Sequence, residues 1–429
     1  MPEIRPFRAI RYSPARFGRE HSKLIAPPYD ILDAKDKAAL LARDPHNIVA
    51  VDLPFVPPKC AGPDEVYAQA AQTLRQWQAE GAMVSEDAPA IYVYHQHYQH
   101  GGRRFVRKKF FARMRLEEFG TGTVFPHERT FGGPKEDRLK LMQATRCQLS
   151  AVFGLYSDPA QAVSGLLAVN EQAPDITATM DGVVNNMWVV RDPAIIDALA
   201  KKMAALPVYI ADGHHRYGTA LIYRDQLNER QPLPNDHPAR FVLVGFCAME
   251  DPGAVILPTH RVLSGFTAEQ ALKIMNSLSA GMDLRPSDAK TLAPADWLPA
   301  GPGADVAVYA ATEDRLCLGT FTRRNVLDTL AADRTPPYRR LDLAYLHDYL
   351  INELITKQAL GGTAPTIQYT HSAEEAAQLA RATSGIAFIT RPCSMADLRA
   401  VGDAGDLMPQ KSTFFYPKLA TGLVVNPLE

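Results

Sequence analysis

The chain has 429 residues, of which 46% are hydrophobic and 22% charged, a composition typical of a globular protein. Its 46 Lys and Arg against 47 Asp and Glu give a formal net charge of −1, so no general basic field exists to hold nucleic acid or an anionic membrane surface. The five cysteines are scattered and form no CxxC pair, which argues against a disulfide framework or a zinc knuckle.

The length predicts two or three domains. The first residues lack the apolar run of a signal peptide, and no apolar stretch approaches the roughly 20 residues of a membrane span. We therefore expect a cytoplasmic protein that acts on a small molecule, with neither nucleic acid nor a membrane as a partner.

The first third of the chain predicts a helix over residues 63–81 and then a hairpin. The helix has proline and two acids in its first turn and a glycine at its end. The hairpin joins residues 90–98 to 103–116 around two glycines. His95 and His97 share one face of its first strand. A solvated strand face is the favoured interpretation of this pair, and a metal-binding pair is the alternative.

The middle of the chain predicts a helix over residues 134–145, a helix-rich stretch over 157–204 with a short strand near Trp188, a strand over 206–210 and a helix over 215–228. Later residues predict a strand pair, 241–249 with 255–262, a helix over 267–278, a linker over 292–305, a hairpin of 306–309 with 315–322, and a helix over 342–357. Strands and helices mix without strict alternation, which favours an α+β fold over a doubly wound sheet.

The strongest local signal is the segment ADGHHRY, residues 211–217, which follows a buried strand and opens a helix. The free amides of a helix start attract anions, and Gly213 lets a ligand approach the backbone. His214, His215 and Arg216 add donors, and arginine holds phosphate oxygens in a planar fork. Asp212 would repel phosphate, so it is better placed as a magnesium ligand or as a base for a hydroxyl group.

Two other interpretations of this turn stay open. Asp212 can cap the helix while the histidines lie on the surface. A zinc site at His214 and His215 is a weaker alternative, because adjacent helical residues point about 100° apart and helical zinc pairs are usually four residues apart.

A second cluster of polar residues spans residues 126–138, a loop followed by a helix start. It places one carboxylate beside a histidine and several cations, and a solvated charged loop is the alternative interpretation. Two weaker candidates lie at 258–261 and 411–413, where a surface role is equally compatible. The candidate residues from these three segments are His127, Glu128, Arg129, Lys135, Arg138, His260, Arg261, Lys411 and Ser412.

Five ordered motifs make the chain similar to a known family. They lie at residues 26–30 (APPYD), 127–139, 211–220, 258–261 and 408–418. By these motifs the chain resembles, over nearly its whole length, the prokaryotic family named domain of unknown function 1015. That family name implies no established activity.

The segment Asp-Gly-His-His-Arg, Asp212 to Arg216, is also similar to the signature of the free-serine kinase branch of the ParB/sulfiredoxin superfamily. This resemblance implies a mixed-sheet core with a large insertion, nucleotide phosphates bound at Gly213 to Arg216, and an essential role for Asp212. It covers only a few residues and implies nothing for the C-terminal third. The role of Glu128 as a catalytic carboxylate is inferred from its chemistry and not from the resemblance.

Together these observations predict a phosphotransferase that uses Mg²⁺ and a nucleotide, ATP or ADP, with free L-serine as the first acceptor to consider. Asp212, Glu128 and His214 are the predicted catalytic residues, with Asp212 as the metal ligand. Lys135 and Arg138 would add phosphate or carboxylate contacts. The alternatives are a nucleotide-binding switch that transfers nothing and a histidine-based hydrolase.

We predict a catalytic domain over residues 1–265 with an inserted hairpin and helices. A C-terminal α+β domain over 266–429 would contribute motif residues 408–418. We also predict that Glu128, Lys135 and His260 lie in or beside the cleft that holds His214, because a site is usually assembled from several loops.

Overall fold

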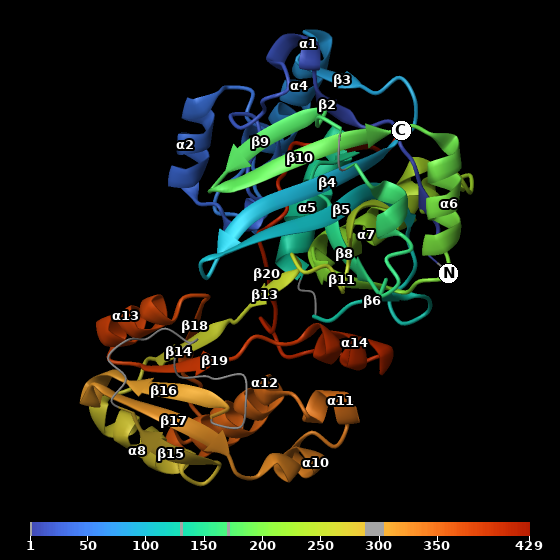
Figure 1. The fold of residues 1–429 in the computed structure, drawn as a ribbon. Helices are drawn as coiled ribbons and strands as arrows, with labels where there is room; N and C mark the ends of the chain where they lie inside the picture. The colour runs from blue at the N-terminus through green and yellow to red at the C-terminus, as the bar shows by residue number, and fades with distance from the viewer. Residues whose placement is uncertain (1, 129–131, 170–171, 288–303) are drawn as a thin grey trace. The chain divides into compact units, whose positions relative to one another are not determined.

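The computed structural model describes residues 2–128, 132–169, 172–287 and 304–429. These residues form two compact units (Figure 1). The first unit joins residues 1–255 to residues 417–429, and the second consists of residues 256–416. The division differs from the predicted boundary at residue 265, because the last thirteen residues return to the first unit.

A nine-stranded mixed sheet organises the first unit. Most neighbouring strands are antiparallel, but two pairs, β6 with β11 and β8 with β12, are parallel. The strands in sheet order are β6 (Val124–Phe125), β11 (Val208–Asp212), β8 (Val152–Tyr156), β12 (Phe241–Ala248), β5 (Arg103–Arg115), β4 (Ile91–His100), β10 (Val183–Val190) and β9 (Ile176–Met180), and β1 (Ile4–Arg5) pairs with β5. The prediction of an α+β fold with a mixed sheet is confirmed.

Helices pack against this sheet and against one another. Helices α5 and α7 lie side by side, and α7 contacts β8 and β12. The helices are α1 (Pro14–Phe17), α2 (Ala34–Arg43), α3 (Val49–Asp52), α4 (Asp64–Ala79), α6 (Pro193–Met203), α5 (Gly132–Thr145) and α7 (His214–Arg230). Two short sheets complete the unit, β2 (Ile10–Tyr12) with β3 (Met83–Ser85) and β7 (Cys147–Gln148) with β21 (Asn426–Pro427).

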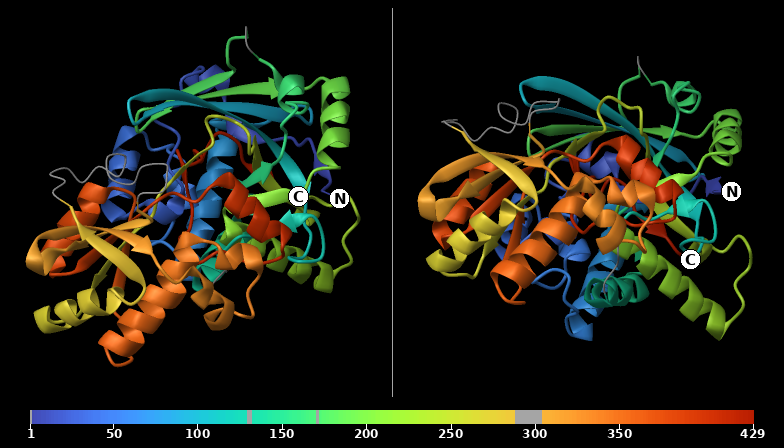
Figure 2. Two further views of the ribbon diagram at one scale, coloured as in Figure 1. Left: turned by 60° about the horizontal axis from the view of Figure 1, so that its bottom comes forward. Right: turned by 90° about the horizontal axis from the view of Figure 1, so that it is seen from below.

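The second unit contains a six-stranded antiparallel sheet. Its order is β15 (Met282–Pro286), β17 (Arg315–Phe321), β16 (Val306–Ala310), β19 (Ile386–Thr390), β14 (His260–Ser264) and β18 (Thr366–Thr370). The helix α13 (Ala373–Thr383) packs on β14 and β19. The helix α8 (Ala268–Leu278) packs beside the π-helical segment η6 (Tyr345–Ala359), and the two can be followed in Figure 2.

Shorter helices in the second unit are α10 (Leu327–Leu330), α11 (Pro336–Arg339), α12 (Asp342–Ala344) and α14 (Met395–Asp403). Strand β13 (Val255–Leu257) pairs with β20 (Phe414–Tyr416). Most of the predicted linker over residues 292–305 lies outside the described residues. Over the part of the chain that the structure describes, no helix combines the length and the apolar character needed to cross a membrane.

Three sequence predictions fail for identifiable reasons. Residues 157–204 are not mainly helical, since β9 and β10 form a hairpin there around Asp181 and Gly182, which both have positive φ. Residues 255–262 are two strands separated at Pro258, and they do not pair with β12. His95 is only 8% exposed and packs against the Trp188 ring, so its strand face is not solvated.

Candidate functional site

The predicted glycine turn is the junction between β11 and α7. Gly213 has φ +92°, a left-handed conformation that favours glycine, and a side chain there would also meet Arg216 Nε at 3.0 Å. No side chain caps the start of α7, and His214 is buried. The interpretation of Asp212 as a helix cap with surface histidines is therefore wrong.

The carboxylate of Asp212 lies between two cations. Lys418 Nζ donates to Oδ2 at 3.0 Å, and Arg216 Nη2 lies 3.7 Å from Oδ1. Burial raises the pKa of Asp212, but Lys418 and Arg216 outweigh it and hold the pKa below its usual range. Lys418 was part of a sequence motif but not a predicted site residue. It reaches the turn because the C-terminal segment returns to the first unit.

This arrangement does not fit a metal ion at Asp212, because both of its oxygens already face cations. Within the described residues, no group of three or more His, Cys, Asp or Glu side chains is arranged to hold a metal ion. The predicted role of Asp212 as a magnesium ligand is therefore not carried further, and its carboxylate is better described as the group that positions Lys418 and Arg216.

Arg216 is turned back under the glycine turn and is only 9% exposed. Its Nη1 donates to the carbonyl oxygen of Ala151, the residue before β8. The guanidinium also borders a cavity of about 30 Å³, whose lining includes Asp52, Arg138 and Ser150. One nitrogen of the planar Arg216 guanidinium is thus fixed to the main chain, and this contact orients the guanidinium next to the start of α7.

Two buried histidines connect the loop after β6 to the start of α7. His127 Nδ1 donates to the carbonyl oxygen of Ile210 at 2.6 Å, and its main-chain N–H donates to His214 Nε2 at 3.2 Å. The two rings meet edge to face at 4.6 Å. Burial lowers the pKa of both histidines, that of His214 well below its usual value. Because His214 Nε2 accepts a hydrogen bond it carries no proton, so His214 positions the loop and does not supply a fixed positive charge.

These histidines predict a pH dependence of stability. The pKa of each is lower in the folded protein than in the unfolded chain, so the free energy of unfolding falls as the pH drops through the unfolded value of about 6.5. We expect His214→Gln to reduce the loss between about pH 7.5 and about pH 5.5 by about 1 kcal/mol, measured by urea denaturation. An equal pH dependence in wild type and His214→Gln would contradict the assignment.

Glu128 lies close to His127, and Lys135 lies beside α7. Glu128 Oε1 is 3.9 Å from His127 Nε2, and its side chain is 23% exposed. Lys135 extends along α7, where a side chain at Gly218 would meet Lys135 Cε at 3.0 Å. Within the described residues Lys135 takes part in no ion pair, so its charge is available to a ligand. Arg129 lies outside the described residues.

Arg138 is already neutralised by two carboxylates. It donates to Asp137 at 2.8 Å and to both the carbonyl and the carboxylate oxygen of Asp52, at 2.7 and 3.3 Å. Its guanidinium lies 3.7 Å from the centre of the Tyr29 ring, and Ser150 donates to Asp52 at 2.9 Å. Tyr29 of the motif at residues 26–30 therefore contacts Arg138 of the 127–139 motif. The contacts of Arg138 hold these two segments and Asp52 together. Sequence reasoning did not identify Asp52 or Ser150.

The two remaining motifs meet in the second unit. Arg261 is fully buried and donates to His347 Nε2 at 3.1 Å and to the carbonyl oxygen of Lys411 at 3.0 Å. His260 accepts a hydrogen bond from the main-chain N–H of Thr390, and Ser412 is buried, whereas Lys411 is exposed. These contacts tie residues 411–413 to β14. His260 and His214 belong to different units, so their predicted shared cleft stays a prediction.

The fold and the site define an α+β protein with a mixed sheet whose charged residues gather at a strand–glycine–helix junction. A family model described as Protein of unknown function (DUF1015) matches residues 4–344, and the chain belongs to this family. No curated protein matches the sequence significantly.

Several solved structures resemble the chain at 10% sequence identity. Free serine kinase in complex with AMP has a TM-score of 0.35, with 73% of this chain and 92% of that chain covered. A conserved hypothetical protein from Pyrococcus furiosus has a TM-score of 0.34, with 74% and 95% covered. SbnI with a C-terminal truncation, from Staphylococcus aureus, has a TM-score of 0.33, with 71% and 84% covered.

Proposed function

We propose that the protein is a nucleotide-dependent phosphotransferase that acts on a small hydroxylated metabolite, with free L-serine as the first acceptor to test. The observation that carries the proposal is the uncapped start of α7 at Gly213, with Lys418 and Arg216 held beside it by Asp212. A helix start with fixed cations is suited to the oxygens of a nucleotide phosphate. The choice of serine rests on the similarity of residues 212–216 to the free-serine kinase motif.

Phosphoryl transfer requires mainly positioning and charge neutralisation, and the residues of this site can supply both. The amides at Gly213 and the first turn of α7, together with Arg216, would hold the phosphates. Lys418 and Lys135 would balance the negative charge that moves during transfer.

Glu128 is the carboxylate best placed to accept the proton of the acceptor, because within the described residues its charge is not neutralised by Lys or Arg. In the proposed step the acceptor oxygen forms a bond to the terminal phosphorus. The bond from that phosphorus to the bridging oxygen breaks, its electron pair leaves with the shortened nucleotide, and the hydroxyl proton passes to Glu128.

Arg216→Lys tests the phosphate contact. Lysine keeps the charge but loses the planar fork, so we expect nucleotide affinity to fall by about ten- to a hundredfold. Titration calorimetry measures the affinity. Arg224→Lys, on the same helix and paired with Glu118 at the surface, is the matched control and should bind as wild type does. Unchanged affinity in Arg216→Lys would remove Arg216 from the phosphate site.

Nucleotide binding by itself tests the foundation of the proposal. Calorimetry of the wild-type protein with ATP, ADP, CTP and GTP, each with and without magnesium, should show binding of at least one of them. If none binds, the proposed function fails. If one binds but no acceptor is phosphorylated, the nucleotide-binding switch becomes the better description, since it requires the same helix start without a base.

A further inference from the structure

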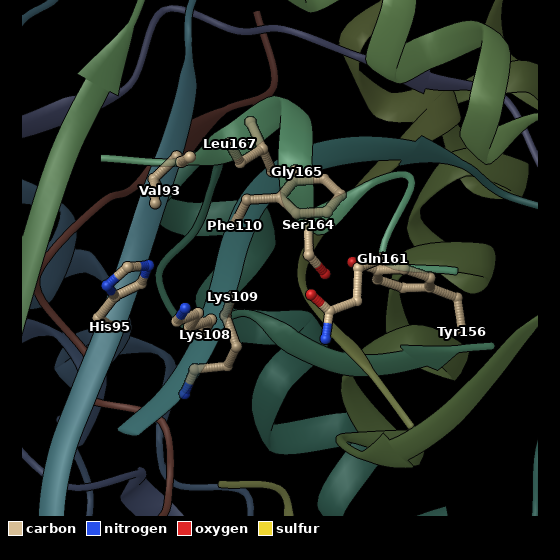
Figure 3. Close-up of a pocket in the computed structure, with 11 residues that line it drawn as sticks. Val93, His95, Lys108, Lys109, Phe110, Tyr156, Gln161, Ser164, Gly165 and Leu167 are labelled. Atoms are coloured by element: carbon tan, nitrogen blue, oxygen red, sulfur yellow. The ribbon is translucent and has the colours of Figure 1, made fainter. Parts of the chain in front are cut away.

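A second cavity lies in the first unit, away from the glycine turn. Its volume is about 190 Å³, large enough for a small metabolite (Figure 3). It is bordered by the β4–β5 hairpin, by the end of β8 and by residues 161–168. Figure 3 shows His95 and Lys108 on one side and Gln161 and Ser164 on the other.

The cavity is separate from the proposed phosphate site, as the register of β8 shows. Phe153 in β8 pairs with Asp212 at the glycine turn, whereas Tyr156, three residues further along, borders the cavity. Three residues of a strand span about 10 Å. Phe153 and Tyr156 also point to opposite faces of the sheet, because side chains alternate along a strand. A ligand in this cavity would therefore not occupy the proposed phosphate site.

The lining of the cavity combines an apolar surface with positive charge. Val93, Phe110 and Leu167 supply apolar side chains, and the lining contains two lysines and no acidic residue. Lys108 is exposed and forms no ion pair within the described residues. Lys109 is already engaged, because its ammonium group donates to Gln96 and lies 4.3 Å from the centre of the Tyr94 ring.

His95 is the buried polar group of this cavity. It is only 8% exposed, and over the described part of the chain its ring has an aromatic contact with Trp188 but no hydrogen-bond partner. The His95 ring nitrogens are not among the fully buried polar atoms that lack a partner; the ring borders the open cavity, where a ligand atom can form a hydrogen bond with it. Burial and the nearby Lys108 lower the pKa of His95 to about 4, so the ring is neutral near pH 7 and offers one N–H donor.

The segment that closes the cavity is held in place by Asp158. Its carboxylate accepts hydrogen bonds from the main-chain N–H groups of Ala162, Val163 and Ser164. Asp158 is buried, and it is not among the residues that line the cavity. The walls of the site are thus built by the fold and do not depend on a ligand.

We propose that this cavity binds a small organic carboxylate with an apolar body, its carboxylate group beside His95 and Lys108 and its apolar part against Phe110 and Leu167. The site is independent of the proposed phosphotransferase activity. A ligand bound here would be a second small molecule, a substrate or a regulator, and would differ from the nucleotide that donates the phosphate.

Benzoate and its neutral counterpart benzamide are suitable probes, because they share a ring and differ in charge. We expect titration calorimetry of the full chain to give a Kd of about 1 mM or lower for benzoate and weaker binding of benzamide. Lys108→Met should weaken benzoate about three- to fivefold and leave benzamide unchanged, since an exposed charge contributes modestly. Lys201→Met, on the exposed side of α6, is the matched control and should have no effect.

Gly165→Phe locates the binding site. Gly165 lines the cavity, and a Cβ at this position meets nothing within 4 Å, so Gly165→Phe adds bulk at the cavity wall without a clash at its Cβ. We expect this variant to keep the wild-type melting temperature and to lose benzoate binding. The proposal is overturned if wild type binds no benzoate, if benzamide binds as tightly as benzoate, or if Gly165→Phe binds benzoate as wild type does. Nucleotide binding should be unchanged in every variant, which separates this test from that of the proposed function.

Discussion

Glu128→Gln is expected to reduce phosphoryl transfer by about 10²–10⁴-fold while nucleotide affinity stays within about twofold of wild type. Glutamine has nearly the same shape but cannot accept the proton of the acceptor hydroxyl. Glu128 lies next to His127, whose hydrogen bonds to Ile210 and His214 fix the loop, so the substitution changes the chemistry with little effect on the site geometry.

The control for this variant is Glu136→Gln, which makes the same change at an exposed position of α5 and should transfer phosphate at the wild-type rate. Rates are measured with saturating nucleotide and acceptor, and affinities by calorimetry. Full turnover in Glu128→Gln would exclude Glu128 as the base. A parallel loss of affinity and turnover would instead place it in nucleotide binding.

Asp212→Asn is expected to reduce turnover at least a hundredfold and to lower the free energy of unfolding by about 3 kcal/mol. The carboxylate holds Lys418 at 3.0 Å and Arg216 at 3.7 Å, and its loss leaves two neighbouring cations without a counter-charge. Nucleotide affinity should hold or improve, because a negative charge near the phosphates is removed. Thermal stability, affinity and turnover are measured on the same preparation.

Lys418→Met with Asp212→Asn completes a double-mutant cycle, in which the two losses of stability should be less than additive because each removes the same contact. Additive losses would show that the pair is not coupled. An Asp212→Asn protein with full turnover and wild-type stability would contradict the role assigned to Asp212.

The low pKa of Asp212 sets the pH range in which this contact stabilises the fold. A carboxyl group whose pKa is lowered on folding stabilises the protein above its unfolded pKa, near 3.9, and loses that contribution as the pH falls toward the folded value. The difference in stability between wild type and Asp212→Asn should therefore be constant above about pH 5 and shrink below about pH 4.

Local patterns were sufficient to predict the junction at the centre of the site. The buried strand before residue 211, the glycine and the following helix identify β11, Gly213 and α7 from sequence alone. The β4–β5 hairpin and the helices α4 and α5 were also predicted, because their turn residues and apolar periodicity are local signals.

Long-range contacts could not be predicted in the same way. Asp212 meets Lys418, 206 residues later, only because the chain returns to the first unit after residue 416. Arg138 looked available for phosphate, but Asp52 neutralises it from 86 residues away. The alternating histidines of β4 suggested a solvated surface, whereas Trp188 packs on His95 from β10, of which only the end near Trp188 was predicted as a strand. Each of these depends on tertiary contacts, which override local pattern.

Phosphorus NMR of the purified protein with a nucleotide and candidate acceptors tests the central proposal most directly. Wild-type protein is incubated with ATP or ADP, with magnesium, in the presence and absence of L-serine and other small hydroxylated metabolites. The proposed function predicts a phosphate-monoester signal that appears only with an acceptor, grows together with the shortened nucleotide, and is lost in Glu128→Gln. No monoester signal with any acceptor, from a protein that calorimetry shows to bind the nucleotide, would contradict the proposed phosphotransferase.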